Sequence, residues 1–421
     1  MATLAEVLQR CGPAYLREHP LSSPQAKAWR GICACRTPAL GGQRLACSHC
    51  GHSHWHYHSC RNRHCPQCGA RAKDAWLQGR LAEVLDVPYA HLVFTLPHQL
   101  HSLYRSQPRW VIDTLFACTA RTLGAFAANP RWMGVAGGQG AFSLVLHTWG
   151  QDLRQHLHLH AVMACGVLSP DGRWALPSRK PDFLFPVHAL SSVFRAHFMA
   201  ALRGLAGARA ELDEAKPDPR RDPKPDPKRD PNLTAEGRRA LYRHAWVVYA
   251  KTPLGGPAQV LNYLSRYTHR TAIGNERIQA ITHKDEVVFS VRADAHGGKR
   301  RVTLPGDEFI RRFLLHILPT GIQRIRHYGV LANGCKKTQL ARARQALSQP
   351  APNPPAHEAA QAFMARVARI DVLRCPQCQH GPLRVVERLG GAQRLPLPGA
   401  PVPTFAAAGQ TRQARQARGP P

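Results

Sequence analysis

His158 and His160 flank Leu159 in a stretch where polar and apolar residues alternate. Successive side chains of a β-strand point to opposite faces of a sheet, so both imidazoles are expected on one face. Two imidazoles on one face can hold a divalent metal ion. Further along the chain, Tyr263 and Tyr267 are four positions apart, which puts both phenols on one face of a helix. A metal ion beside two tyrosines on a very basic chain indicates DNA cleavage with tyrosine as the nucleophile.

The histidine segment offers further donors. His156 shares the face of the histidine pair, while the leucines between them face the other way. Two neutral imidazoles suit Mg²⁺ or Mn²⁺ poorly without a third donor beside them. Either His147 or Gln151, on a neighbouring strand or turn, could supply it, and the sequence leaves both open. The competing interpretation is a solvated polar face without metal.

The tyrosines are expected on a helix over residues 260–268. A phenol has a pKa of about 10, so it needs nearby cations or a metal to act as a nucleophile. The competing interpretation is a pair of half-buried helix residues whose rings pack. The neighbouring side chains that could interact with a phosphate are Arg266, His269 and Arg270.

Eight of the thirteen cysteines lie before Leu85. Among them are two C-x2-C pairs, a pattern typical of a zinc ribbon, in which each pair supplies two thiolates to one tetrahedral ion. The predicted zinc ligands are therefore Cys47, Cys50, Cys65 and Cys68. The alternate donors are Cys35, Cys60 and His64.

Basic residues near these N-terminal cysteines indicate that the zinc-binding segment binds DNA. The alternative is a zinc module with a purely structural role. The basic residues are Arg61, Arg63 and Arg71. Near the C-terminus, Cys375 and Cys378 form another C-x2-C pair, followed only by His380. Since no partner pair follows, zinc binding is not the favoured interpretation there.

The composition points to a polyanionic partner. The 421 residues carry 57 Lys and Arg against 26 Asp and Glu, a formal net charge of +31. Such a balance predicts nucleic-acid binding that weakens steeply with salt. No signal peptide or apolar run of membrane-spanning length is visible, which favours a cytoplasmic protein. In a reducing compartment, so many cysteines favour metal binding over disulfides.

The chain should divide into two or three units. We expect a zinc-binding, DNA-recognition domain at 1–88, a catalytic domain at 89–345 and a largely disordered tail at 346–421. An Asp/Pro-rich segment at 211–233 should be a flexible insertion, because its prolines and charges resist burial. Strands are predicted at 93–97, 142–147, 157–163 and 287–291, and helices at 110–128 and 309–318. A basic run after the catalytic segment should contact phosphates, with a solvated charged face as the alternative. The residues of this basic run that are predicted to bind DNA are Arg324, Arg326 and His327.

Several strings together resemble the IS91 family of transposases, members of the HUH (His-hydrophobic-His) endonucleases. They are CRNRHCPQC at 60–68, YAHLVFTLP at 89–97, HTWGQ at 147–151, HLHLH at 156–160, YLSRYTHR at 263–270 and RIRHYG at 324–329. Leucine stands at 157, where the family pattern has proline, and this keeps the alternation.

The resemblance implies an α+β fold: a Rep-like antiparallel sheet with packed helices, preceded by a small zinc-ribbon-like domain. It implies structural Zn²⁺, catalytic Mg²⁺ or Mn²⁺, and metal-dependent cleavage and transfer of single-stranded or hairpin DNA at transposon ends. The intermediate would be a 5′-phosphotyrosine on Tyr263 or Tyr267, in a rolling-circle type of transposition. His158 and His160 match the histidine pair of the family.

Two rival functions remain on the sequence alone. A rolling-circle replication initiator or relaxase uses the same histidines and tyrosines. A zinc-ribbon DNA-binding protein with vestigial catalytic residues would bind DNA without a covalent adduct. No Gly-rich lysine loop for nucleoside triphosphates is present, so no nucleotide cofactor is expected.

Overall fold

The computed structural model describes residues 2–81, 83–178, 184–214, 230–254, 271–293, 298–351, 358–369 and 371–392. They fall into two compact units, Gly69–Glu358 and the combination of Ala2–Cys68 with Ala359–Pro421. The expected boundary at residue 88 differs from this division, because helix α4 (Ala70–Leu81) is grouped with the larger unit.

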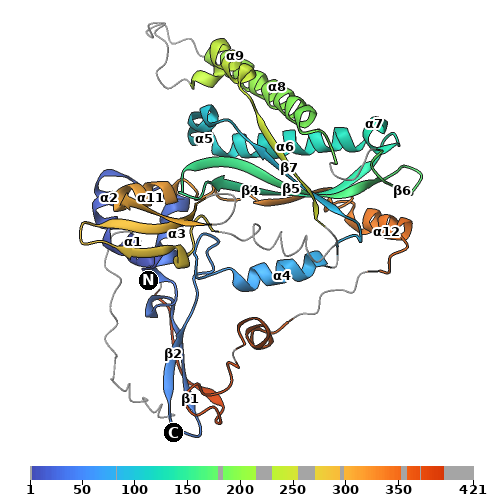
Figure 1. Ribbon diagram of the computed structural model, residues 1–421. Helices are drawn as coiled ribbons and strands as arrows, with labels where there is room; N and C mark the ends of the chain where they lie inside the picture. Colours follow the sequence, from blue (N-terminus) through green and yellow to red (C-terminus); the bar gives the residue numbers. More distant parts are fainter. Residues whose placement is uncertain are drawn as a thin grey trace, which may run out of the picture. The chain divides into compact units, whose positions relative to one another are not determined.

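The larger unit is built on a six-stranded antiparallel sheet (Figure 1). Its main path runs β11 (Ile325–Gly329), β4 (Gln139–Trp149), β5 (Gln155–Leu168), β3 (Tyr89–Thr95) and β7 (Val247–Leu254), and the short β6 (Trp174–Ala175) pairs with β5. The strands predicted at 142–147 and 157–163 are therefore confirmed, and each is longer than expected.

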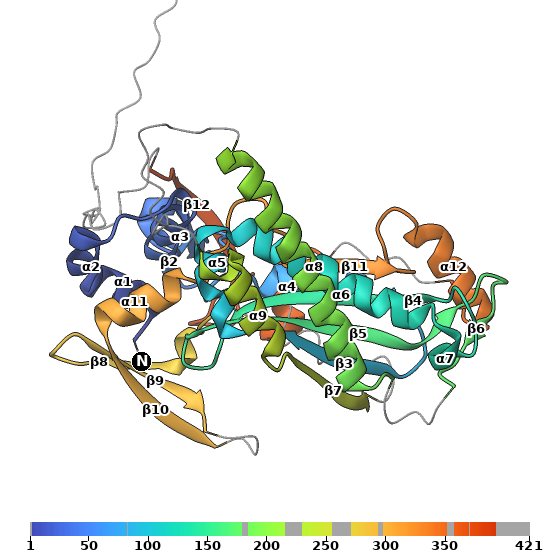
Figure 2. The ribbon, with the colours of Figure 1, turned by 90° about the horizontal axis from the view of Figure 1, so that it is seen from above.

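One face of this sheet carries the main hydrophobic core. Leu157, Leu159 and Ala161 of β5 are fully buried against helices α6 (Pro108–Ala127) and α8 (Val187–Glu214). In Figure 2 both helices lie over the sheet. The helix predicted at 110–128 is confirmed as α6. It ends where Asn129 caps the next helix, α7 (Pro130–Met133), by accepting a hydrogen bond from the backbone of Arg131.

Among the described residues, a second core covers part of the opposite face. Val162 and Ala164 of β5 pack there with Leu340 and Ala343 of α12 (Lys336–Ala346), and helix α4 contributes Trp76. The alternation of β5 places His158 and His160 on this same face, next to that core. The period-two pattern of the sequence therefore has a structural cause, since the leucines fill the core and the histidines face away from it.

The larger unit contains several further elements. They are η2 (His98–Leu100), α5 (His101–Ser106), η3 (Pro231–Leu233), α9 (Ala235–Arg243), η4 (Asn275–Arg277), α11 (Gly306–Leu314), and a three-stranded antiparallel sheet of β8 (Ile278–Ile281), β9 (Glu286–Arg292) and β10 (Lys299–Pro305). Phe289 of β9 packs edge-on against Phe309 of α11, with ring centroids 5.5 Å apart. The strand predicted at 287–291 is confirmed, and the helix predicted at 309–318 begins and ends earlier.

The predicted flexible insertion at 211–233 is too long at both ends. Helix α8 continues to Glu214, and residues 215–229 lie outside the described residues. The turn at Pro231–Leu233 is packed, because the side-chain amide of the buried Asn232 donates to the carbonyl of Gln99 at 2.9 Å. Its prolines and charges predicted a flexible insertion up to residue 233, but Asn232 is buried and Leu233 belongs to the main hydrophobic core.

The smaller unit joins the two ends of the chain. Three helices, α1 (Leu4–Arg10), α2 (Gly12–Glu18) and α3 (Ser23–Ala34), are followed by η1 (Pro38–Leu40) and the hairpin of β1 (Gly42–Cys47) and β2 (Ser53–Tyr57). The C-terminal part adds α13 (Ala360–Phe363), η5 (Met364–Ala368) and β12 (Leu383–Leu389), and β12 pairs antiparallel with β1. The expectation of a largely disordered tail is therefore wrong for 371–392. These residues contain the C-x2-C turn of Cys375 and Cys378, called the C-terminal knuckle below, and strand β12. Residues 393–421 lie outside the described residues.

Across the part of the chain that the structure describes, no helix combines the length and the apolar character needed to cross a membrane.

Candidate metal centres

Three buried histidines meet on the face of the large sheet that carries the second core. His147 of β4 lies directly opposite His158 of β5, and His160 follows two residues later on the same face. One ring nitrogen from each lies within 4.8 Å of the others. Nδ1 of His147 and Nε2 of His160 are 3.1 Å apart. Two nitrogens bound to one metal through bonds of about 2.1 Å would be separated by about 3 Å, so this pair already has the spacing of adjacent ligands.

The ring of His158 is oriented by its own strand. Its Nδ1–H donates to the backbone carbonyl of His156 at 2.8 Å, which leaves the Nε2 lone pair for a metal. Burial, with a smaller contribution from His156, lowers the pKa of His158 to about 4. The imidazole is therefore neutral near pH 7, which is the protonation state that ligates a metal.

His160 is held by a residue to which the sequence assigned no role. Nδ1 of His160 lies 2.9 Å from Nε2 of the buried His91 on β3, and the two rings stack with centroids 5.2 Å apart. If Nε2 of His160 is kept for a metal, its Nδ1–H donates to His91. Metal-bound histidines are commonly fixed in this way by a partner on the other ring nitrogen. His91 sits inside the 89–97 motif, but only the pairing of β3 with β5 brings it to His160.

The third histidine is backed by an aromatic stack. The ring of His147 lies 4.8 Å from that of Trp149 with an interplanar angle of 19°. The guanidinium of Arg324 lies over Trp149 at 5.3 Å, which places a cation one layer behind the histidine. Of the two candidates for third ligand, His147 is grouped with the pair. Gln151 lies exposed in the turn between β4 and β5, and its backbone carbonyl accepts a hydrogen bond from Arg277.

The predicted nucleophiles fall outside the described residues. These are Tyr263 and Tyr267, together with Arg266, His269 and Arg270.

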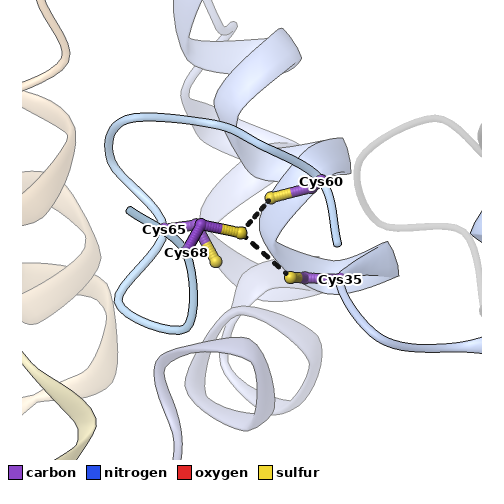
Figure 3. A group of neighbouring side chains, drawn as sticks. All are labelled: Cys35, Cys60, Cys65 and Cys68. Atoms are coloured by element: carbon purple, nitrogen blue, oxygen red, sulfur yellow. Dashed lines mark hydrogen bonds between the residues drawn. The ribbon is translucent and has the colours of Figure 1, made fainter. Parts of the chain in front are cut away.

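The cysteines of the smaller unit form two clusters, where the sequence predicted one set of four ligands with three alternate donors. In the first, Cys35 follows α3 and joins Cys60, Cys65 and Cys68 (Figure 3). The sulfur of Cys68 lies 3.5 Å from that of Cys35 and 3.6 Å from that of Cys60. Four thiolates around one zinc ion, with bonds of about 2.3 Å, would have sulfurs about 3.8 Å apart, so this cluster fits a zinc ion. Hydrogen bonds from Cys60 and Cys65 lower the pKa of Cys35, which favours its thiolate.

The grouping of Cys47 and Cys50 with Cys65 and Cys68 is therefore wrong. The structure divides these four residues, since Cys47 and Cys50 lie with Cys375 and Cys378. The physical reason is the pairing of β12 with β1, which carries the C-terminal knuckle to the end of the hairpin. Two of the three alternates, Cys35 and Cys60, complete the first cluster, and His64 is not part of it.

The predicted DNA-binding residues differ in their surroundings. Arg61 and Arg63 are exposed beside the first cysteine cluster, and Arg71 donates to the backbone carbonyl of Glu358. Arg326 forms an ion pair with Asp113 and lies 4.1 Å over the ring of Phe116.

His327 is enclosed in a hydrogen-bonded network. Its Nδ1 lies 2.7 Å from the hydroxyl of Ser143, and its Nε2 lies 3.1 Å from the guanidinium of Arg80. Burial and the charges of Arg80 and Lys336 lower the pKa of His327 to about 4. A neutral, hydrogen-bonded imidazole acts in packing, so phosphate contact is not what these contacts favour for His327.

Comparisons with known proteins agree with these features. A family described as "Putative transposase" matches residues 140–339, which include the three histidines. A family described as "Transposase zinc-binding domain" matches residues 7–96, which include all of the first cysteine cluster.

Two curated relatives extend over most of the chain. The putative transposase y4qJ of Sinorhizobium fredii (strain NBRC 101917 / NGR234) is 39% identical over 408 residues, covering 93% of this chain and 97% of the relative. The transposase for insertion sequence element IS801 of Pseudomonas savastanoi pv. phaseolicola is 27% identical over 375 residues, covering 88% of this chain and 85% of the relative.

Among solved structures, the conjugative relaxase TrwC in complex with mutant OriT DNA matches 37% of this chain and 65% of its own. It has 18% identity and a TM-score of 0.23, which is too low to carry an argument. The 39% identity to y4qJ extends over nearly the whole chain, and two transposase domain families match it as well. The chain therefore belongs to the IS91 family of transposases.

Proposed function

We propose that this transposase cleaves and rejoins single-stranded DNA at transposon ends through a tyrosine nucleophile, with a divalent metal ion bound by His147, His158 and His160. The observation that carries the proposal is the geometry of these three buried histidines on one face of the sheet. In the reaction, a tyrosine oxygen attacks the scissile phosphorus and the 3′ oxygen leaves as a hydroxyl. A 5′-phosphotyrosine results, and its energy is retained for the transfer step, so no nucleotide is required.

The donor set suits a metal that must also contact substrate. Three neutral imidazoles fill only part of a coordination sphere and leave positions open for a phosphate oxygen. When bound, the ion would polarise the phosphate and stabilise the charge that develops on it. His158 and His160 are held in place by the carbonyl of His156 and by His91, so the ligands are oriented before the ion binds. Because Mg²⁺ prefers oxygen ligands, an assay should compare it with Mn²⁺.

The proposed nucleophiles are Tyr263 and Tyr267, on the sequence pattern and the family membership alone. Arg324 supports phosphate binding near the metal, since its guanidinium stacks over Trp149, which in turn stacks on His147. The formal net charge of +31 favours association with DNA over the whole surface.

The strand beside the metal site supports binding of an unpaired DNA strand. In the sheet register, Val93 lies opposite both His160 and Tyr249, and Thr95 lies opposite both His158 and Val247. Tyr249 and Val247 of the edge strand β7 therefore share the face of the histidines. Their exposed fractions, 52% and 57%, are high for large apolar side chains. A ring in this position can stack on a base as the strand passes the metal.

Replacing Tyr249 with alanine is expected to raise the Kd for single-stranded DNA about tenfold, because stacking on an aromatic ring contributes about 1–3 kcal/mol per base. Tyr249→Phe is the matched control and should bind like the wild type, because it keeps the ring. Fluorescence anisotropy with labelled single-stranded oligonucleotides measures both. Equal affinities for the alanine and phenylalanine variants would contradict a stacking role.

The experiment that tests the reaction uses labelled single-stranded DNA from the ends of the element, with Mn²⁺ or Mg²⁺, analysed on a denaturing gel. We expect a protein–DNA band that survives denaturant and is absent with EDTA. The double variant Tyr263→Phe/Tyr267→Phe should lose this band and keep its affinity for DNA. A wild-type chain that binds the DNA but forms no adduct with either ion would contradict the proposal. A band that persists in the double variant would overturn the choice of nucleophile.

A further inference from the structure

The second cysteine cluster has the dimensions of a metal site, although its halves are far apart in the chain. The sulfur of Cys47 lies 3.7 Å from that of Cys378, and the sulfur of Cys50 lies 3.6 Å from that of Cys375. A disulfide would need about 2.05 Å, whereas four sulfurs around one tetrahedral ion are about 3.8 Å apart. These distances therefore fit an ion at the centre and exclude sulfur–sulfur bonds in this conformation.

Both pairs form the same local turn, in which the backbone N–H four residues after the first cysteine donates to the carbonyl of that cysteine: Gly51 to Cys47 at 3.2 Å and Gln379 to Cys375 at 3.0 Å. The backbone N–H of His49 donates to the sulfur of Cys47 at 3.4 Å, and the backbone N–H of Gly381 donates to the sulfur of Cys378 at 3.4 Å. Such amide donors stabilise thiolates, the form of cysteine that binds a metal ion. Two C-x2-C turns with amide donors are the two halves of a zinc ribbon.

At Gly381 there is no room for a side chain beside the sulfurs. A Cβ atom at this position would overlap the sulfur of Cys47 and lie 2.6 Å from the Cβ of His49. Any other residue would push the C-terminal turn away from the hairpin. The glycine after the second pair therefore allows the close approach that four sulfurs around one ion require.

The pairing of β1 with β12 brings the two turns together. Cys47, at the end of β1, lies opposite Leu383, at the start of β12, and the N–H of Ser48 donates to the carbonyl of Pro382 at 3.3 Å. Cys375 is completely buried. The matching zinc-binding family ends at residue 96, so it includes Cys47 and Cys50 and does not reach the C-terminal pair.

We propose that Cys47, Cys50, Cys375 and Cys378 bind a second zinc ion, which fastens the C-terminal segment to the N-terminal hairpin and closes the smaller unit. Each half supplies only two ligands, so neither end of the chain can hold the ion alone. The transposase would then carry two structural zinc ions in one unit, one bound within the N-terminal segment and one bound jointly by both ends.

The test is the metal content of the purified full-length protein, measured by mass spectrometry for zinc and iron together, since four thiolates can also hold iron. We expect two zinc ions per wild-type chain and one in Cys375→Ser/Cys378→Ser. Cys47→Ser/Cys50→Ser should also retain one. Combining all four substitutions should still leave one, because all four residues serve the same ion. Cys335→Ser is the matched control, a partly exposed cysteine outside both clusters, and should keep two.

In each variant of the second cluster, the one zinc ion that is retained shows that the protein has folded, because the first cluster lies in the same unit. A wild-type chain with one zinc, or a Cys375→Ser/Cys378→Ser variant with two, would overturn the second site. One iron and one zinc per wild-type chain would overturn the assignment of zinc. Gly381→Val gives an independent check: it keeps every sulfur, yet it should lose the second zinc because its side chain occupies the approach to Cys47.

Discussion

Replacing His158 and His160 together with alanine is expected to reduce DNA cleavage by about 10³-fold while leaving DNA affinity nearly unchanged. The lost metal would have supplied several kcal/mol of charge stabilisation at the reacting phosphate. A barrier change of about 1.36 kcal/mol corresponds to a tenfold change in rate. Affinity depends mainly on basic residues that this substitution leaves in place. Single-turnover cleavage on denaturing gels and anisotropy binding curves measure the two quantities separately.

Two single variants serve as graded controls for this prediction. His156→Ala changes an exposed histidine on the same face that is outside the triad, so it should cleave nearly like the wild type. His91→Ala removes the partner of His160 without removing a ligand. It should raise the Mn²⁺ concentration needed for half-maximal cleavage by about 10–100-fold, with recovery at saturating metal. Wild-type cleavage by the double variant would refute the metal assignment, and a metal-independent defect in His91→Ala would refute the positioning role.

Replacing Cys60 and Cys65 with serine is expected to unfold the smaller unit. Structural zinc sites contribute about 10–16 kcal/mol of apparent binding free energy, which matches or exceeds the total stability of an ordinary domain at about 5–15 kcal/mol. The buried Cys65 would also leave a polar hydroxyl facing the remaining thiols. Calorimetry should therefore show the loss of one unfolding transition, accompanied by zinc loss and weaker binding to transposon-end DNA.

Cys33→Ser provides the comparison for this variant. Cys33 lies on α3 near the first cluster but outside it, and burial raises the pKa of its thiol to about 12, so it stays protonated. This variant should keep its zinc and both transitions. If Cys60→Ser/Cys65→Ser keeps the same calorimetric profile as Cys33→Ser, the first cluster is not a structural zinc site.

The histidine pair could be predicted because its geometry is local. Alternation along one strand fixes which side chains share a face, and no knowledge of the rest of the fold is needed. The other members of the site depend on strand register. His147 joins the histidine group only because β4 places it opposite His158, and His91 reaches His160 only from β3. The choice between His147 and Gln151 therefore required the tertiary structure.

The cysteines show even more clearly that sequence spacing predicts local geometry but not which distant residues meet. The spacing within each C-x2-C pair is a local property, and it correctly marks every knuckle. Which knuckles combine is decided by chain topology, and the nearest pairs in sequence belong to different clusters. Treating Cys375 and Cys378 as isolated follows from assuming that partners lie nearby in the chain. Cys378 is instead separated from Cys47 by 331 positions, and Cys375 from Cys50 by 325.

The closure of the smaller unit by β12 sets an order of events during protein synthesis. Strands β1 and β2 leave the ribosome with only each other as partners, and the residues that pair with Cys47 and Cys50 emerge after the entire large sheet. Translation must therefore run to the last strand before the unit that joins the two ends is complete. A copy interrupted before residue 375 would retain all three histidines but lack both the strand and the cysteine pair that complete the smaller unit.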